Sequence, residues 1–434
     1  EKISANGETS SLEWKVDVKK AIASISLLPL LRHKVNVYDV MGEDIAYVQQ
    51  RKHKANTVRS EDTPSVASVL GNEAHKTAPM AKKTSEKTRE KKSDKKGKKP
   101  WRITVNNAVV RGHHSFSIDK IKGDLDGGLS ADVSIETKNG PFSLRNGKTD
   151  ITLNSLQIGD GQMVLKESTI DAKVEILPVV FSENKGIKIL KFLTLDSDIK
   201  AQMGNLDFLD IYLRSVKEMQ LDGKGLLSGH INFDKGVLIS GTELKVDADE
   251  LSLAMLGHEV KGNGEVELNV MSAKPDELNV KVLFDDLQAY YSAAEQKKNG
   301  APLFVGKGLL AEAKGDPSLF PESSKTKKVT YLNIEIPSVK VEDLGQFQRY
   351  IPEKLNYKLY GGEGTLEAKA SLLANSFKSK VQVQSTGAHI GIDKQHLQSD
   401  LDLLLNLDAD NGQKFSVDLS GSYLSLTNSK LFNQ

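Results

Sequence analysis

The sequence has no cysteine and few aromatic residues. The absence of cysteine excludes disulfides, thiolate metal sites and cysteine nucleophiles, although it does not fix the cellular compartment. Aromatic residues make up 6% of the 434 residues and hydrophobic residues 38%. Globular domains usually reach about 45–50% apolar residues when glycine is included. The composition therefore favours a thin architecture with a large surface over a compact globule.

The chain also has little net charge and no long hydrophobic run. A formal net charge of +1 argues against a nucleic-acid binder that uses the whole chain. No run approaches the roughly 18 apolar residues that a membrane-spanning helix needs. The chain begins at Glu1 and not at methionine, so we expect that an N-terminal signal or membrane anchor is missing from it.

No catalytic motif is present in the sequence. It lacks a G-x-G-x-x-G that opens a helix, a P-loop, an H-E-x-x-H and a G-x-S-x-G. The nine histidines are scattered, and His113-His114 is the only adjacent pair. Neighbours on a strand point to opposite faces, so this pair is either half of a metal site or an ordinary surface feature. We therefore expect no enzyme activity, no catalytic residues, no cofactor and no metal.

What the sequence does contain is alternation. From about Trp101 to Leu426, apolar residues return at every second position between Gly, Asn and Asp turns. This period puts one set of side chains on one face of a sheet. It predicts a mainly β fold: an elongated, curved antiparallel sheet, either an open groove or an incomplete barrel or sandwich. The apolar residues expected to line such a groove are Val237, Ile239, Leu251, Leu253, Val266, Leu268, Val270, Leu332, Ile334, Ile336, Val381, Val383, Leu403, Leu405 and Leu407.

Two or three short helices are expected to cap the sheet. Helical spacing of apolar residues predicts them at 205–219 and 341–350, with a third possible at 285–298. Pro352 ends the second. A glycine-rich strand opening follows each of the first two, at 222–231 and 360–369, which indicates a weak internal repeat.

Three regions differ in composition along the chain. The alternation of apolar and polar residues predicts a small strand unit at residues 1–48 and an extended β-rich body at residues 101–434. Between them, residues 49–100 lose the apolar periodicity and end in a run of lysines, so we expect this insertion to be disordered. Its basic run either tethers the protein to anionic lipid or another polyanion, or is a solvated linker.

The opening stretch resembles the AsmA-like family of bacterial envelope proteins. The residues that carry the resemblance are Ile25-Ser26-Leu27-Leu28-Pro29-Leu30-Leu31-Arg32-His33-Lys34-Val35-Asn36-Val37, then Gly42 to Val48, then the tryptophan strand Trp101 to Val110. The unit from Ile336 to Lys369 looks like another segment of that family. The lysine-rich insertion departs from the pattern, because a short turn is expected there. The resemblance covers about a quarter of the chain and rests on hydrophobic patterns.

The resemblance implies a periplasmic body anchored to the inner membrane. It also implies a bridge-like lipid carrier that supports phospholipid transport to the outer membrane and outer-membrane biogenesis. A groove of interchangeable Val, Leu and Ile side chains fits this role, whereas the same face closed on itself would be an ordinary sandwich core. The alternative function is a periplasmic scaffold that influences outer-membrane protein assembly through protein contacts at exposed strand edges. The expected partners are thus acyl lipid, the membrane and an envelope protein, without nucleic acid.

Overall fold

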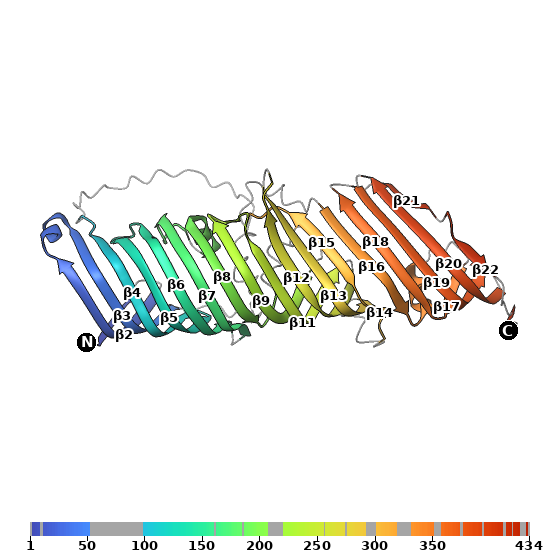
Figure 1. Cartoon of the computed structure of the whole chain (residues 1–434), viewed down its shortest axis with the longest axis horizontal. Helices are drawn as coiled ribbons and strands as arrows, with labels where there is room; N and C mark the ends of the chain where they lie inside the picture. The colour runs from blue at the N-terminus through green and yellow to red at the C-terminus, as the bar shows by residue number, and fades with distance from the viewer. Residues whose placement is uncertain are drawn as a thin grey trace, which may run out of the picture. The chain divides into compact units, whose positions relative to one another are not determined.

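The protein is described by a computed structural model that consists mainly of β-strands (Figure 1). This confirms the predicted mainly β, antiparallel fold class. The described residues are 2–8, 12–52, 99–159, 162–184, 186–206, 220–255, 257–273, 276–291, 301–318, 331–350, 357–373, 376–392, 395–410, 414–418, 420–425 and 431–432.

The chain divides into two compact units. Unit 1 comprises Glu1–Ile199 with Phe233–Gly236, and unit 2 comprises Lys200–Asn232 with Val237–Gln434. This division differs from the one drawn from composition, because strand pairing joins residues 1–48 to the strands after Trp101. Each unit is described by itself.

Unit 1 is a sheet whose strands pair in chain order from β1 to β7. Its elements are β1 (Ile3–Glu8), β2 (Leu12–Ser26), η1 (Leu28–Arg32), β3 (Lys34–Arg51), β4 (Arg102–Ile118), β5 (Ile121–Glu136), β6 (Phe142–Ile158), β7 (Gln162–Val179), η2 (Gly186–Phe192) and β8 (Leu193–Met203), which contains the boundary.

One pairing in unit 1 is parallel, and it accounts for the position of the insertion. β3 and β4 run in the same direction, with Lys34 beside Arg102 and Gln49 beside Ile118. The end of β3 and the start of β4 therefore lie at opposite ends of the sheet. Parallel strands cannot be joined by a tight turn. A long connection such as the insertion is therefore needed between them. The prediction that residues 49–100 are disordered is wrong at 49–51, which continue β3, and residues 53–98 lie outside the described residues.

Unit 2 continues the antiparallel arrangement. Its elements are β9 (Gln220–Asp234), β10 (Val237–Leu238), β11 (Glu243–Met255), β12 (His258–Met271), β13 (Glu277–Tyr291), β14 (Phe304–Gly306), β15 (Leu309–Gly315), β16 (Tyr331–Val341), η4 (Leu344–Tyr350), β17 (Tyr357–Gly361), β18 (Gly364–Leu373), β19 (Ser376–Ile392), β20 (Gln395–Asp410), β21 (Lys414–Asp418), β22 (Tyr423–Ser425) and β23 (Leu431–Phe432).

β14 and β15 are two parts of one interrupted strand. Both pair with β13 on one side and with β16 on the other. Gly308 lies at the interruption with φ +75°, and its N–H donates a 2.7 Å hydrogen bond to the carbonyl oxygen of Phe284. A glycine tolerates this left-handed conformation without a Cβ clash. The register on β13 and on β16 continues unchanged across the interruption, so the closed cycle of pairings among these four strands comes from one interrupted strand in a sheet and not from a small barrel.

The expected helices have three different outcomes. The helix at 341–350 is present as η4, a 3₁₀ helix whose Gly345 N–H is capped by the Asp343 carboxylate at 2.8 Å. The helix at 285–298 is wrong for its first half, because β13 extends to Tyr291, and its second half lies outside the described residues. Most of the helix at 205–219 also lies outside them.

Candidate functional site

The fifteen apolar residues predicted to line a groove all lie in unit 2 and fall into two classes of burial. Five have exposed fractions of 2% to 5%: Leu251, Leu253, Val266, Leu268 and Val270. The other ten are half-buried: Val237, Ile239, Leu332, Ile334, Ile336, Val381, Val383, Leu403, Leu405 and Leu407. Between Val237 and Ile239, the buried residue is Leu238, so the alternation there has the opposite phase to the one expected.

The five inaccessible residues belong to a closed core in the first part of unit 2. Leu268 on β12 lies between Leu244 on β11 and Val280 on β13, and all three are at most 8% exposed. Phe284 on β13 is fully buried. Side chains this inaccessible contact protein atoms on every side. In this structure these strands form a core and do not offer a surface to lipid.

The half-buried residues on β16 to β20 share one face of the sheet. Strand register places Ile336 beside Ala368, Ala368 beside Val381, and Val381 beside Leu405. In the next row, Ser379 on β19 lies between Ala370 and Leu407, and in the row on the other side Val383 lies beside Leu403. Together they form a surface that we call the C-terminal stripe: Leu332, Ile334, Ile336, Ala368, Ala370, Leu372, Val381, Val383, Leu403, Leu405 and Leu407.

The C-terminal stripe is large for an uncovered apolar surface. Four strands about 4.8 Å apart and four rows about 6.6 Å apart cover about 500 Å². Monomeric soluble proteins rarely expose contiguous apolar patches beyond a few hundred Å² unless the patch has a function. A surface of this size requires either a partner or a ligand.

One end of the C-terminal stripe runs into a small closed core. Leu344 of η4 is 1% exposed and packs with Val339, Leu359 and Ile390. Ile336, Val381, Val383 and Leu403 pack against the margin of this cluster. η4 thus covers one end of the apolar face and leaves the remaining rows half-buried.

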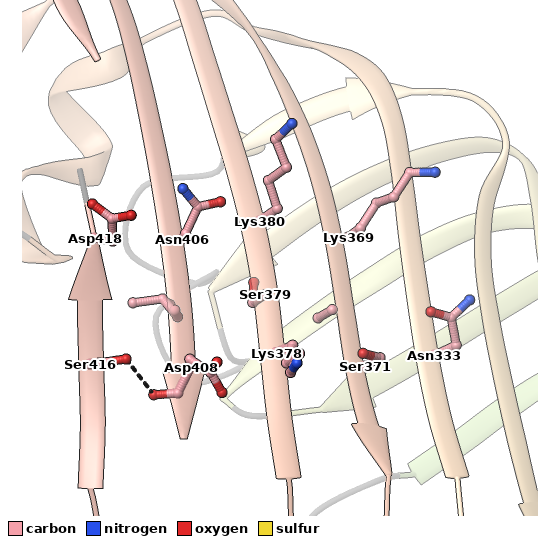
Figure 2. Close-up of a pocket in the computed structure, with 12 residues that line it drawn as sticks. Asn333, Lys369, Ser371, Lys378, Ser379, Lys380, Asn406, Asp408, Ser416 and Asp418 are labelled. Atoms are coloured by element: carbon pink, nitrogen blue, oxygen red, sulfur yellow. Dashed lines mark hydrogen bonds between the residues drawn. The ribbon is translucent and has the colours of Figure 1, made fainter. Parts of the chain in front are cut away.

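The opposite face of the same strands is polar (Figure 2). A shallow hollow there is lined mainly by polar side chains, among them Asn333, Lys369, Lys378 and Asp408. Ligand pockets are usually lined by apolar and aromatic side chains with a few convergent polar groups. This hollow has the opposite character, so we assign it no ligand.

Unit 1 carries an apolar face whose residues are not among the fifteen predicted to line a groove. Register places Val105 beside Val133, Val133 beside Leu144, and Leu144 beside Ile176. These side chains are half-buried, as are Ile103 and Phe142 in the next row. We call these six residues the N-terminal stripe. The period-two pairs Ile103/Val105 and Phe142/Leu144 were the signal that would have found it.

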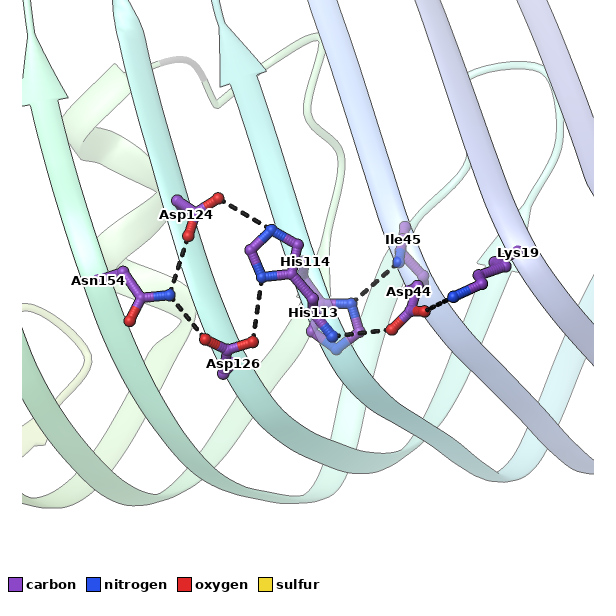
Figure 3. Close-up of polar contacts among 8 residues, drawn as sticks. All are labelled: Lys19, Asp44, Ile45, His113, His114, Asp124, Asp126 and Asn154. Carbon is purple, nitrogen blue, oxygen red and sulfur yellow. Dashed lines mark hydrogen bonds and ion pairs between the residues drawn. The ribbon is translucent and has the colours of Figure 1, made fainter.

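A polar cluster crosses unit 1 around His113 (Figure 3). The His113 ring lies between two carboxylates, 3.0 Å from Asp126 Oδ1 and 3.1 Å from Asp124 Oδ2. The Asn154 amide donates to both carboxylates, at 2.9 Å and 2.7 Å. The backbone N–H of His113 donates to Asp44, which also pairs with Lys19. The cluster therefore ties β2 through β6 together across their polar face.

His114 points away from this cluster, as alternation predicts. Its Nδ1 accepts a 3.1 Å hydrogen bond from the backbone N–H of Ile45, and its buried Nε2 has no hydrogen-bond partner. His113 and His114 therefore do not converge on one ligand. Within the described ranges, no group of three His, Asp or Glu residues is placed to hold a metal ion.

The His113 cluster predicts a pH dependence of stability. The hydrogen bond to Asp126, followed by the charge of Asp124, raises the pKa of His113. A raised pKa means that the charged cluster stabilises the fold fully below the ordinary histidine pKa and loses this contribution as pH rises through the folded-state value. We expect His113→Gln to lower the thermal unfolding temperature by a small amount at about pH 6, and the difference to vanish by about pH 9. An equal difference at both pH values would contradict this assignment.

No family model, curated protein or solved structure matches this chain. The resemblance to the AsmA-like family therefore stays a prediction. Among the helices that the structure describes, none has both the length and the apolar character needed to cross a bilayer.

Proposed function

We propose that this protein is a non-enzymatic envelope protein that shields the acyl chains of phospholipids on the apolar faces of its sheet. In this role it supports phospholipid transport between the inner and outer membranes. The observation that carries the proposal is the C-terminal stripe, an apolar face on β16 to β20 with a polar face behind it. The resemblance to AsmA-like proteins supports a periplasmic location with an anchor in the inner membrane.

The energetics favour an acyl chain as the occupant. Each methylene exposed to water costs about 0.8 kcal/mol, so a chain of about 15 methylenes costs about 12 kcal/mol. The C-terminal stripe provides apolar contact along one side of such a chain. At the same time, covering the stripe removes its own contact with water. Both partners therefore gain from the same contact.

The nature of the stripe also predicts weak selectivity. Its side chains are aliphatic, and apolar pockets discriminate poorly between ligands that differ by a methylene or two. Headgroup recognition would need convergent charged groups on the same face, but the charged side chains Lys369, Lys378 and Asp408 lie on the other face. We therefore expect several phospholipid classes to bind, in proportions that follow their abundance.

The direct experiment is lipid extraction from the purified protein. The whole chain, purified without detergent, should yield phospholipid by mass spectrometry of an organic extract. It should also bind a fluorescent acyl probe that phospholipid displaces. Absence of phospholipid together with absence of probe binding would refute the proposal. A specific crosslinked protein partner in that case would favour the scaffold function instead.

A further inference from the structure

The end of unit 1 at which β3 and β4 begin carries an unusual set of exposed apolar side chains. Leu27 is 72% exposed, Leu28 81% and Leu31 84%. Leu28 and Leu31 lie three residues apart in the 3₁₀ helix η1, so they project from the same side of it. Trp101 and Ile135 reach the same end of the sheet and are 37% and 42% exposed. We call these five residues the apolar rim.

The apolar rim is held in place by hydrogen bonds. The N–H of Arg102 donates to the carbonyl oxygen of His33 at 3.0 Å, and this bond joins the end of η1 to the start of β4. The His33 and Trp101 rings lie 5.1 Å apart. The N–H of Trp101 donates to Thr137 Oγ1 at 2.8 Å. The leucines are thus displayed on an ordered turn, so their binding to a surface would require little reorganisation.

Basic residues surround the apolar rim. Arg32, His33, Lys34, Lys99 and Lys138 are all exposed at this end of unit 1. The acidic Glu136 is paired with Arg102 at 3.1 Å, so its charge is compensated. Exposed leucines, a half-exposed tryptophan and adjacent cations together match the chemistry of a bilayer interface that contains anionic lipid.

We propose that the apolar rim docks unit 1 on the surface of a phospholipid bilayer, with the η1 leucines inserted between the headgroups and the basic residues on anionic phosphates. This docking is separate from the acyl-chain function, because it uses a turn at the end of the sheet and not a sheet face. Membrane docking by the apolar rim can therefore fail in an experiment while acyl-chain binding by the C-terminal stripe is retained, and the reverse also holds. Protein docking at the rim is the competing outcome that the experiment must separate.

The chain's two tryptophans provide an internal control for this geometry. Trp14 pairs in register with Gln49, whereas Trp101 precedes Arg102, which lies beside Lys34. Trp101 is therefore level with His33, sixteen residues from Gln49, which places the two tryptophans about 50 Å apart along the sheet. Trp14→Phe leaves Trp101 as the sole reporter at the rim, and Trp101→Phe leaves Trp14 as the sole reporter at the far end.

The experiment is flotation of the full chain with vesicles of phosphatidylethanolamine and a minority of phosphatidylglycerol. We expect the protein to float with them, and Leu28→Asp with Leu31→Asp to weaken partitioning by about tenfold or more. The control is Leu373→Asp, a leucine of unit 2 that is 63% exposed; it should float like the wild type. Because the two aspartates also add negative charge, Leu28→Ser with Leu31→Ser, which keeps the charge unchanged, should weaken flotation as well.

Brominated lipid tests the orientation independently. Quenching of Trp101 in the Trp14→Phe variant, without quenching of Trp14 in the Trp101→Phe variant, is the expected result. Failure of the wild-type chain to float, flotation of the double variant at the wild-type level, or equal quenching of the two tryptophans would each overturn the proposal.

Discussion

Replacing Val381 and Leu405 by aspartate should abolish lipid binding while the sheet remains folded. These residues are cross-strand neighbours in the C-terminal stripe, and both are half-buried. A carboxylate placed there stays hydrated while the stripe is open, but loses its water when an acyl chain covers it. Burial of a charge without a partner costs several kcal/mol. We therefore expect at least about a hundredfold less phospholipid in organic extracts, since about 2.7 kcal/mol corresponds to that factor.

The matched control lies one residue away on the same two strands. Lys380 pairs with Asn406 in the same register and faces the polar side. Lys380→Asp with Asn406→Asp introduces the same two groups on the opposite face, and should retain lipid. Circular dichroism checks that both variants keep their sheet. If the Val381/Leu405 variant unfolds while the control does not, the C-terminal stripe is a closed core.

Leu268→Ala should destabilise unit 2 far more than Leu405→Ala. Leu268 is 2% exposed between Leu244 and Val280, so its truncation leaves a cavity in a closed core. Such changes cost about 2–5 kcal/mol. Leu405 is half-buried, and solvent or lipid can occupy the space that truncation opens; we expect a cost of about 1 kcal/mol.

Chemical denaturation with tryptophan-independent detection of the sheet, such as circular dichroism, measures this difference. The apo protein is the right sample, because bound lipid would stabilise the native state and mask the effect. Equal destabilisation by the two substitutions would contradict the division of unit 2 into a closed core and an uncovered stripe.

Much of the fold can be predicted from the sequence because the alternation of apolar and polar residues is visible within each strand. The pairs Leu251/Leu253 and Leu403/Leu405 predict strands, and the structure has β11 and β20 at those positions. The Asp234-Lys235-Gly236 turn is also as predicted, with φ of +51° at Lys235 and +94° at Gly236. Positive φ at both central residues is what a tight hairpin of this kind requires.

The direction of the strands and the position of some helices could not be predicted from the sequence. Alternation is the same for parallel and antiparallel strands, so nothing in Val35 or Val37 indicated that β3 would pair in parallel with β4. The third expected helix failed for a related reason. Leu287, Tyr290 and Tyr291 have helical spacing, but Leu287 and Ala289 also alternate, and both are buried on β13. Short apolar segments do not distinguish the two structures.

The sequence could not show which apolar side chains of the sheet are covered by other segments of the chain. Leu268 and Leu405 sit in the same kind of alternating pattern, yet one is inaccessible and the other half-buried. The difference depends on which distant segments pack over each strand, as Leu344 of η4 does over Val339 and Ile390. For the same reason the sequence did not distinguish the N-terminal stripe of unit 1 as a candidate groove, although its residues alternate as clearly as those of unit 2.

Site-specific photocrosslinking tests the central claim most directly. A photoreactive amino acid is placed at Leu405 in one variant and at Asn406 in another, which are adjacent residues that face opposite sides of β20. After irradiation in intact cells, mass spectrometry of the purified protein identifies any adduct. If acyl chains lie on the C-terminal stripe, a phospholipid adduct is expected at position 405 and none at 406. A protein adduct alone at 405, or equal labelling at both positions, would contradict it.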